Sequence, residues 1–189
     1  EIRLSLVGSE MCIRDRILKR DGRLEEFNRN FKESVLRGVF KPIDHRNPGE
    51  YAGPVNYISM VVAYKEGPHS TTPLRICMNS SLKQPAPVGK SLNDCLMKGP
   101  AALADLFTVT LGIREHVVAF TKDLSKFYQS VDADLTAQHL RRVVWRDGDL
   151  SKEPTTYITT KVNYGDKPAG CIAIAAVRLT VETHGGGME

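Results

Sequence analysis

The spacing of apolar residues predicts helices near the start of the chain. Residues 17–37 alternate charged and apolar positions at helical spacing, and the apolar ones gather on one face. That face consists of Leu24, Phe27, Phe31, Val35 and Leu36. Gly22 is a candidate break between two helices, and Gly38 stands where a C-terminal stop is expected. The charged face is predicted to be solvated.

A β-type pattern follows. Residues 41–56 are rich in proline and glycine, which predicts a loop. The runs 57–64 and 74–81 flank the polar stretch 65–73, and together they predict an antiparallel hairpin with a long tip. Residues 155–164 are also rich in β-forming residues.

The remaining patterns mix helices and turns. Residues 92–114 predict helix, interrupted at Gly99-Pro100, where a new helix should begin. The apolar face there is Leu103, Leu106, Phe107 and Leu111. Residues 135–146 fit a helix end or a strand, 146–149 predict a turn, and 165–182 predict a turn and then a helix of small residues. This irregular mixture predicts an α+β fold rather than repeated βαβ units.

One acidic residue separates two of these patterns. Val117–Phe120 form a short apolar run of β type, whereas Leu124, Phe127, Tyr128 and Val131 have helical spacing. Asp123 lies between them. A carboxylate at a strand end can project into a cleft and bind Mg²⁺, and Tyr128 would lie one helical turn away. The alternative is that Asp123 only caps the helix.

The composition and charge of the chain limit the classes of function that it could have. The chain has 189 residues, 41% hydrophobic and 25% charged, as expected of a globular protein. Its net charge of +4 is unevenly distributed, with +3 in residues 46–100 and −1 in residues 101–189. This small asymmetry fits either a bound polyanion or an ordinary solvated surface. Cys12, Cys77, Cys95 and Cys171 lack the spacing of a zinc site, which indicates free thiols. No apolar run approaches the roughly 18 residues of a membrane span, so no membrane partner is expected.

An unrelated hydrolytic or metal enzyme is also disfavoured. His45, His69, His116, His139 and His184 show neither metal-ligand nor triad spacing.

Residues 4–16 contain SLVGSEMCIRDR, which resembles a translated sequencing-adapter artefact. We therefore set residues 1–16 aside as a non-native leader. The alternative is a short amphipathic start.

Several blocks of sequence together resemble one family, the reverse transcriptases of BEL/Pao long-terminal-repeat retrotransposons. The blocks are YIS, STTPLRICMNSS, SLNDCLMKGP, DLF, FTKDLSKFYQSV, RRVVWRD and TYITTKVNYGDKPA. The resemblance implies the fingers and partial palm of a right-hand polymerase over residues 46–182. A helical segment (17–45) would precede this part, and a flexible tail (183–189) would follow it.

The resemblance also implies the catalytic chemistry. Asp123 matches the first metal-binding aspartate of the palm, and the backbone carbonyl of Leu124 would help to hold a second ion. The intact enzyme would use two Mg²⁺ ions to transfer nucleotides onto a primer. Tyr128 matches an aromatic steric gate against the ribose 2′-hydroxyl, although a packed core tyrosine is the simpler alternative.

Further positions match the nucleotide-binding residues of the family. Arg75 matches the fingers arginine that pairs with the triphosphate. Lys65 is a candidate for the γ-phosphate, or else an exposed loop lysine. The block lining the nucleotide pocket contributes Tyr164, Gly165 and Pro168. A glycine in this block would let the backbone approach the sugar and base. The partners implied are an RNA or DNA template-primer, deoxynucleoside triphosphates and the remainder of the Pol polyprotein. The implied location is a cytoplasmic virus-like particle, or the nucleus.

Three departures from the family pattern shape the expected activity. Asn79 replaces an aspartate and Gly170 replaces a proline. The Y-x-D-D motif is absent, and no Asp-Asp pair occurs in the chain. We expect the parent protein to be an RNA-directed DNA polymerase and this fragment to be inactive alone. The alternative is a decayed or domesticated, non-catalytic nucleic-acid-binding module.

Overall fold

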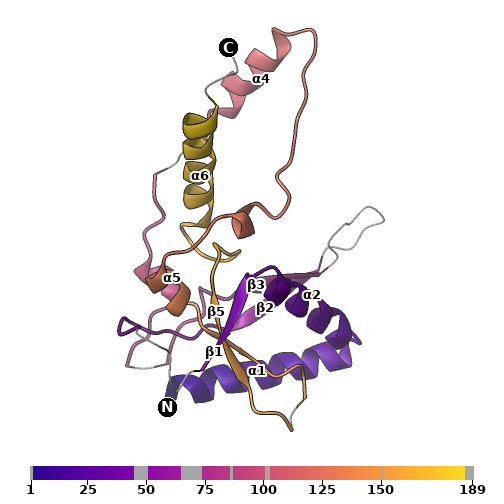
Figure 1. The fold of residues 1–189 in the computed structure, drawn as a ribbon, viewed down its shortest axis with the longest axis vertical. Helices are drawn as coiled ribbons and strands as arrows, with labels where there is room; N and C mark the ends of the chain where they lie inside the picture. Colours follow the sequence, from indigo (N-terminus) through magenta and orange to yellow (C-terminus); the bar gives the residue numbers. More distant parts are fainter. Residues whose placement is uncertain are drawn as a thin grey trace.

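The chain is described by a computed structural model (Figure 1), which covers residues 2–44, 51–64, 74–85, 87–100, 103–149 and 151–185, with side chains from residue 9 onward. The helices are α1 (Ile2–Arg20), α2 (Leu24–Leu36), α3 (Leu92–Cys95), α4 (Leu106–Arg114), the 3₁₀ helix η1 (Phe127–Ser130), α5 (Leu135–His139) and α6 (Ala169–His184). The strands are β1 (Phe40–Ile43), β2 (Met60–Tyr64), β3 (Leu74–Met78), β4 (Val143–Trp145) and β5 (Thr155–Thr159). The fold is therefore α+β, as predicted. None of the helices in these ranges has the length and apolar character needed to cross a bilayer.

The strands form two antiparallel sheets. The order in the larger sheet is β1-β5-β4, with Phe40 opposite Thr159 and Val143 opposite Tyr157. The smaller sheet is the predicted hairpin, in which β2 and β3 pair with Met60 opposite Met78. The predicted loop 41–56 begins too early, because Phe40–Ile43 is a strand. Its proline is tolerated since β1 lies at a sheet edge.

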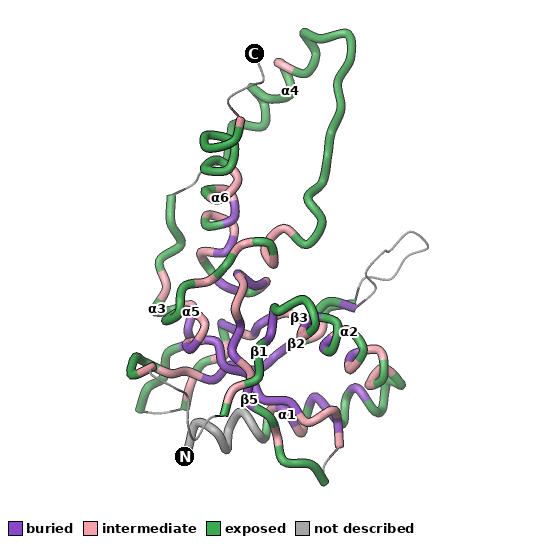
Figure 2. Tube along the Cα trace, in the orientation of Figure 1, coloured by how far each residue is buried: buried purple, intermediate pink, exposed green. Residues whose placement is uncertain are grey.

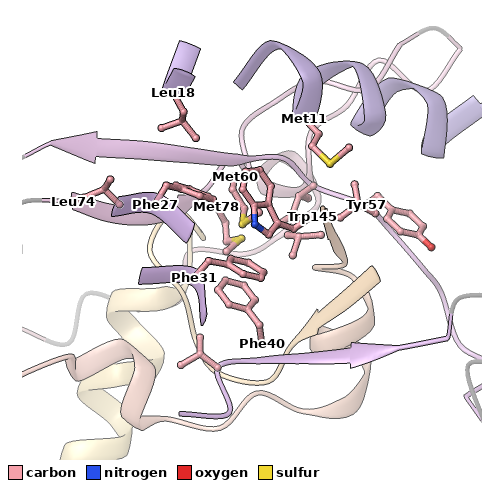
Figure 3. Close-up of a cluster of buried hydrophobic side chains, with 14 of the residues drawn as sticks. Met11, Leu18, Phe27, Phe31, Phe40, Tyr57, Met60, Leu74, Met78 and Trp145 are labelled. Atoms are coloured by element: carbon pink, nitrogen blue, oxygen red, sulfur yellow. The ribbon is translucent and has the colours of Figure 1, made fainter. Parts of the chain in front are cut away.

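The hydrophobic core joins α2 to both sheets. Phe27 and Phe31 are fully buried, which confirms the predicted inner face of this helix. Their rings lie 4.7 Å from Trp145 and 4.7 Å from Phe40, respectively. Figure 3 shows these aromatic rings pointing toward one another beside the methionines of β2 and β3. Leu36 does not share this face, since it is 86% exposed.

The upper part of the molecule is much more exposed than the core. Figure 1 shows α4 and α6 projecting away from the sheets, and Figure 2 shows this region mostly solvent-exposed. The predicted strand at Val117–Phe120 is wrong: the segment forms no strand, and Val117, Val118 and Phe120 are each at least 80% exposed. An apolar run becomes a strand only where another strand completes its hydrogen bonds, and within the described ranges none pairs with it. The apolar face predicted around Leu106 is likewise exposed.

The helix predicted after Asp123 is also shorter than expected. Only Phe127–Ser130 are helical, and they form a 3₁₀ turn. Lys126 precedes them with a φ of 54°, in the left-handed region that few non-glycine residues adopt. This residue prevents a continuous α-helix from starting at Leu124.

Residues 2–16, which the sequence suggested were not native, lie within α1. Met11 packs in the core, and Arg14 donates a hydrogen bond to the Met60 carbonyl at 2.9 Å. Burial lowers the pKa of Arg14 to about 10. Asp15 is buried as well, but its carboxylate accepts no hydrogen bond from the described residues, and Arg146 Nε lies 3.8 Å away. The first half of α1 thus brings both favourable and unfavourable burial.

We expect removal of residues 1–16 to change the free energy of unfolding by less than about 2 kcal/mol. Truncation loses the burial of Met11, worth about 1.5–3 kcal/mol. It also loses the Arg14–Met60 hydrogen bond, worth about 1 kcal/mol. Against this, it removes the Asp15 carboxylate, whose burial without a hydrogen bond costs about 1–3 kcal/mol and is offset only in part by Arg146 at 3.8 Å. Burial raises the pKa of Asp15, so this cost is present at neutral pH and disappears in acid, where the carboxyl is protonated.

Urea unfolding of residues 17–189, followed by circular dichroism, measures this difference. Phe27→Ala in the same truncated chain serves as a control for a cooperative core and should cost about 3–5 kcal/mol. Loss of cooperative unfolding on truncation would show that the start of α1 is an integral part of the fold.

Candidate functional site

A cavity of about 580 Å³ lies between α2, β3 and the segment around η1. This volume is within the range of small-molecule sites, roughly 300–1,000 Å³. The predicted site residues that line it are Arg75, Asp123, Leu124, Tyr128 and Tyr164. The structure therefore brings together residues from three separate parts of the sequence.

Arg75 reaches the cavity because of its position in the hairpin. It lies on β3 opposite Ala63, next to buried Leu74. Since neighbouring residues of a strand point to opposite faces, Leu74 packs into the core while Arg75 is exposed. Its guanidinium is thus available on the face of β3 that borders the cavity.

The two tyrosines form an aromatic corner of the cavity. The rings of Tyr128 and Tyr164 meet edge-on, with centroids 4.9 Å apart. Phe127 stacks beside Tyr128 at 5.8 Å. Burial is the main cause that raises the pKa of Tyr164, while the charge of Arg75 lowers it. Tyr164 therefore stays protonated at neutral pH and can act as an apolar wall with a hydroxyl donor.

The backbone after Tyr164 is held tightly against β3. The Met78 N–H donates to the Tyr164 carbonyl at 2.8 Å. Gly165 has a φ of 111°, and a Cβ on it would lie 2.0 Å from the Met78 carbonyl oxygen. The φ and the short distance both require glycine at this position. In the structure, however, the close approach is to β3. Pro168 precedes the first residue of α6 and does not line the cavity.

The described residues that line the cavity include two carboxylates, Glu33 and Asp123. Among the described residues, no three acidic, histidine or cysteine side chains converge as a metal centre. Asp123 is exposed, and Glu33 is the second carboxylate among the residues lining the cavity. Mg²⁺ accepts one or two carboxylates when substrate phosphates supply further oxygen ligands. Asp123 is therefore suited to a nucleotide-bound cation but not to two-metal catalysis by itself.

One wall of the cavity was not predicted from the sequence. It consists of residues of α2 and its C-cap: Asn30, Glu33, Ser34 and Arg37. Helical periodicity had assigned this face to solvent, because periodicity does not show which distant segment faces a helix. Lys126 also lines the cavity. Lys65 lies outside the described residues.

Asn79 and Gly170, the two residues that differ from the family pattern, lie near the site, and neither of them disturbs the packing around the cavity. The Asn79 N–H donates to the Ser59 carbonyl at 2.9 Å, so its backbone is held by the start of β2. A Cβ on Gly170 would lie 3.9 Å from the Tyr128 hydroxyl, an ordinary contact.

Comparison with known proteins does not identify a family for this chain. No protein-family model matches it, and no curated protein matches it. The family suggested by the sequence blocks is therefore put forward below as a proposal.

Proposed function

We propose that this chain is the nucleotide-binding part of a BEL/Pao-type reverse transcriptase, an RNA-directed DNA polymerase of a retrotransposon. One observation carries the proposal: Arg75, Asp123, Tyr128 and Tyr164 line a single cavity of nucleotide size. These residues match positions in the family blocks and come from three separate parts of the sequence, which the fold brings to one cavity.

Each residue type suits a different part of a deoxynucleoside triphosphate. The planar guanidinium of Arg75 can bind phosphate oxygens bidentately. Asp123 can hold the cation that accompanies the triphosphate. Tyr128, packed against Tyr164 at 4.9 Å, would occupy the space of a 2′-hydroxyl and disfavour ribonucleotides.

Binding is proposed without catalysis by this chain alone. Two-metal nucleotidyl transfer needs carboxylates on both ions, and the chain has no Asp-Asp pair. The residues present would bind and orient the nucleotide, with Arg75 neutralising the phosphates. The alternative, a decayed or domesticated non-catalytic nucleic-acid-binding module, is favoured slightly by Asn79, by Gly170 and by the missing Y-x-D-D motif.

Titration with fluorescent N-methylanthraniloyl-dATP in the presence of Mg²⁺ tests the proposal. We expect saturable binding that weakens about tenfold or more in Arg75→Ala, because charge-assisted hydrogen bonds contribute about 1.5–3 kcal/mol. Arg114→Ala on exposed α4 removes the same charge away from the cavity and should leave the affinity unchanged.

Equal weakening in Arg75→Ala and Arg114→Ala would indicate nonspecific attraction and contradict a site at Arg75. Primer extension by the unmodified chain would contradict the proposal that it binds without catalysis.

A further inference from the structure

The turn that carries Tyr164 is held on its outer side by one amide side chain. Asn93 Nδ2 donates to the Gly165 carbonyl at 2.9 Å, and Asn93 Oδ1 accepts from the Lys167 N–H at 2.8 Å. The same Nδ2 also donates to Ser81 Oγ at 2.8 Å. One side chain therefore satisfies a carbonyl and an N–H two residues apart in the turn.

Asn93 is itself fixed by the short helix α3. Ser91 and Asp94 form a reciprocal capping box at its N-terminus. The Asn93 N–H donates to the Ser80 carbonyl at 2.8 Å, which ties the helix to the segment after β3. The side chain is thus presented to the turn from a defined backbone position.

An amide side chain supplies both of the groups that the turn requires. Its NH₂ group donates and its carbonyl accepts, whereas a carboxylate only accepts and an aliphatic side chain does neither. Gly165 has no side chain to restrain the turn, and its φ of 111° is accessible chiefly to glycine. The two hydrogen bonds from Asn93 therefore restrain the Gly165 carbonyl and the Lys167 N–H, while Asp166 between them is held by Ser80.

We propose that Asn93 is a positioning residue that fixes Tyr164 against Tyr128. Asn93 does not line the cavity and acts through the turn at residues 164–168. Without its hydrogen bonds, the turn would still be held by the Met78 N–H and by the buried Asp166 side chain. The Gly165 carbonyl and the Lys167 N–H would lose their restraint, and the Tyr164 ring could shift from its edge-on contact. As a role in nucleotide binding, this inference rests on the proposed function, but the placement of Tyr164 can be measured independently.

The test uses ¹⁹F NMR of the whole chain labelled with 3-fluorotyrosine, with the Tyr164 resonance assigned by its loss in Tyr164→Phe. In Asn93→Ala we expect the Tyr164 resonance to shift or broaden. We also expect the Lys167 amide to exchange with solvent about three- to tenfold faster, as for one lost hydrogen bond. Asp94→Ala is the matched control, because it breaks the capping box of α3. The Asn93 N–H keeps its bond to the Ser80 carbonyl, so the two side-chain bonds to the turn can still form.

An unchanged Tyr164 resonance in folded Asn93→Ala would overturn the inference. So would an equal change in Asp94→Ala, since it would show that Asn93 matters only through α3. If Asn93→Ala does not fold, Asn93→Asp carries the same test. It keeps the acceptor for Lys167 but sets a carboxylate against the Gly165 carbonyl.

Nucleotide titration separates this inference from the proposed function. We expect affinity for the fluorescent dATP to fall about fivefold in Asn93→Ala and to stay constant in Asp94→Ala. If the unmodified chain binds no nucleotide, the proposed function fails. The fluorine spectra and amide exchange would still decide whether Asn93 fixes Tyr164.

Discussion

Asp166→Ala is expected to lower the free energy of unfolding by about 3–5 kcal/mol, because it leaves a buried guanidinium without its counter-ion. Asp166 Oδ2 lies 2.6 Å from Arg141 Nε, and both residues are buried. The contact is an ion pair without the alignment of a hydrogen bond. Ser80 Oγ donates to Asp166 Oδ1 at 2.6 Å, so the substitution also removes the acceptor of a buried hydroxyl. Urea unfolding at neutral pH measures the loss.

Two controls separate this burial effect from loss of charge. Asp132→Ala removes a carboxylate that pairs with Lys161 but is 82% exposed, so we expect a change below about 1 kcal/mol. The double variant Asp166→Leu with Arg141→Met should recover much of the stability, because no buried charge remains unpaired. A loss in Asp166→Ala as small as that in Asp132→Ala would contradict the buried pair.

The elements that sequence alone predicted correctly are those fixed by local patterns. Helix α2 follows from the spacing of Phe27 and Phe31, and the β2–β3 hairpin follows from two β-type runs around a polar tip. Each pattern identifies which side chains must leave water, and the hydrogen bonds of the element close within the helix or between strands that are adjacent in sequence. These elements therefore form as predicted.

The strand predicted at Val117–Phe120 does not form, because a strand needs a second strand as its hydrogen-bonding partner, and that partner can lie far away in the sequence. An apolar run shows that burial would be favourable, but it does not show that another strand is available. The described residues supply none, so the run stays exposed. Asp123 consequently lies on an irregular segment, although it still reaches the cavity.

The candidate site was predicted in part. Arg75, Tyr128 and Tyr164 came from the family resemblance, and their shared cavity could not be derived from periodicity. No periodic pattern in the sequence indicates the role of Asn93, because its side chain–backbone hydrogen bonds form only where distant segments meet in three dimensions. The S-x-x-D spacing of Ser91 and Asp94 was the one local signal near it, since it resembles a capping box.

Gly165→Ala should be among the most damaging single-methyl additions in this chain. Its φ of 111° disfavours any other residue, at a cost of about 1–2 kcal/mol. The added Cβ would also lie 2.0 Å from the Met78 carbonyl oxygen, a backbone atom that cannot rotate away. Overpacking of this kind costs about 1–3 kcal/mol more. We therefore expect a loss of about 2–5 kcal/mol by urea unfolding, with weaker binding of the fluorescent dATP.

Gly89→Ala is the matched control, because it tests a positive φ without a close contact. The difference between the two variants therefore measures the effect of the contact with β3. Gly89 also has a positive φ, 61°, but nothing lies within 4 Å of the position its Cβ would take. It should therefore lose only the conformational part, about 1 kcal/mol. Equal losses in the two variants would mean that the turn moves off β3 at little cost. Tyr164 would then not be held beside Arg75, and a preformed cavity could not explain nucleotide binding.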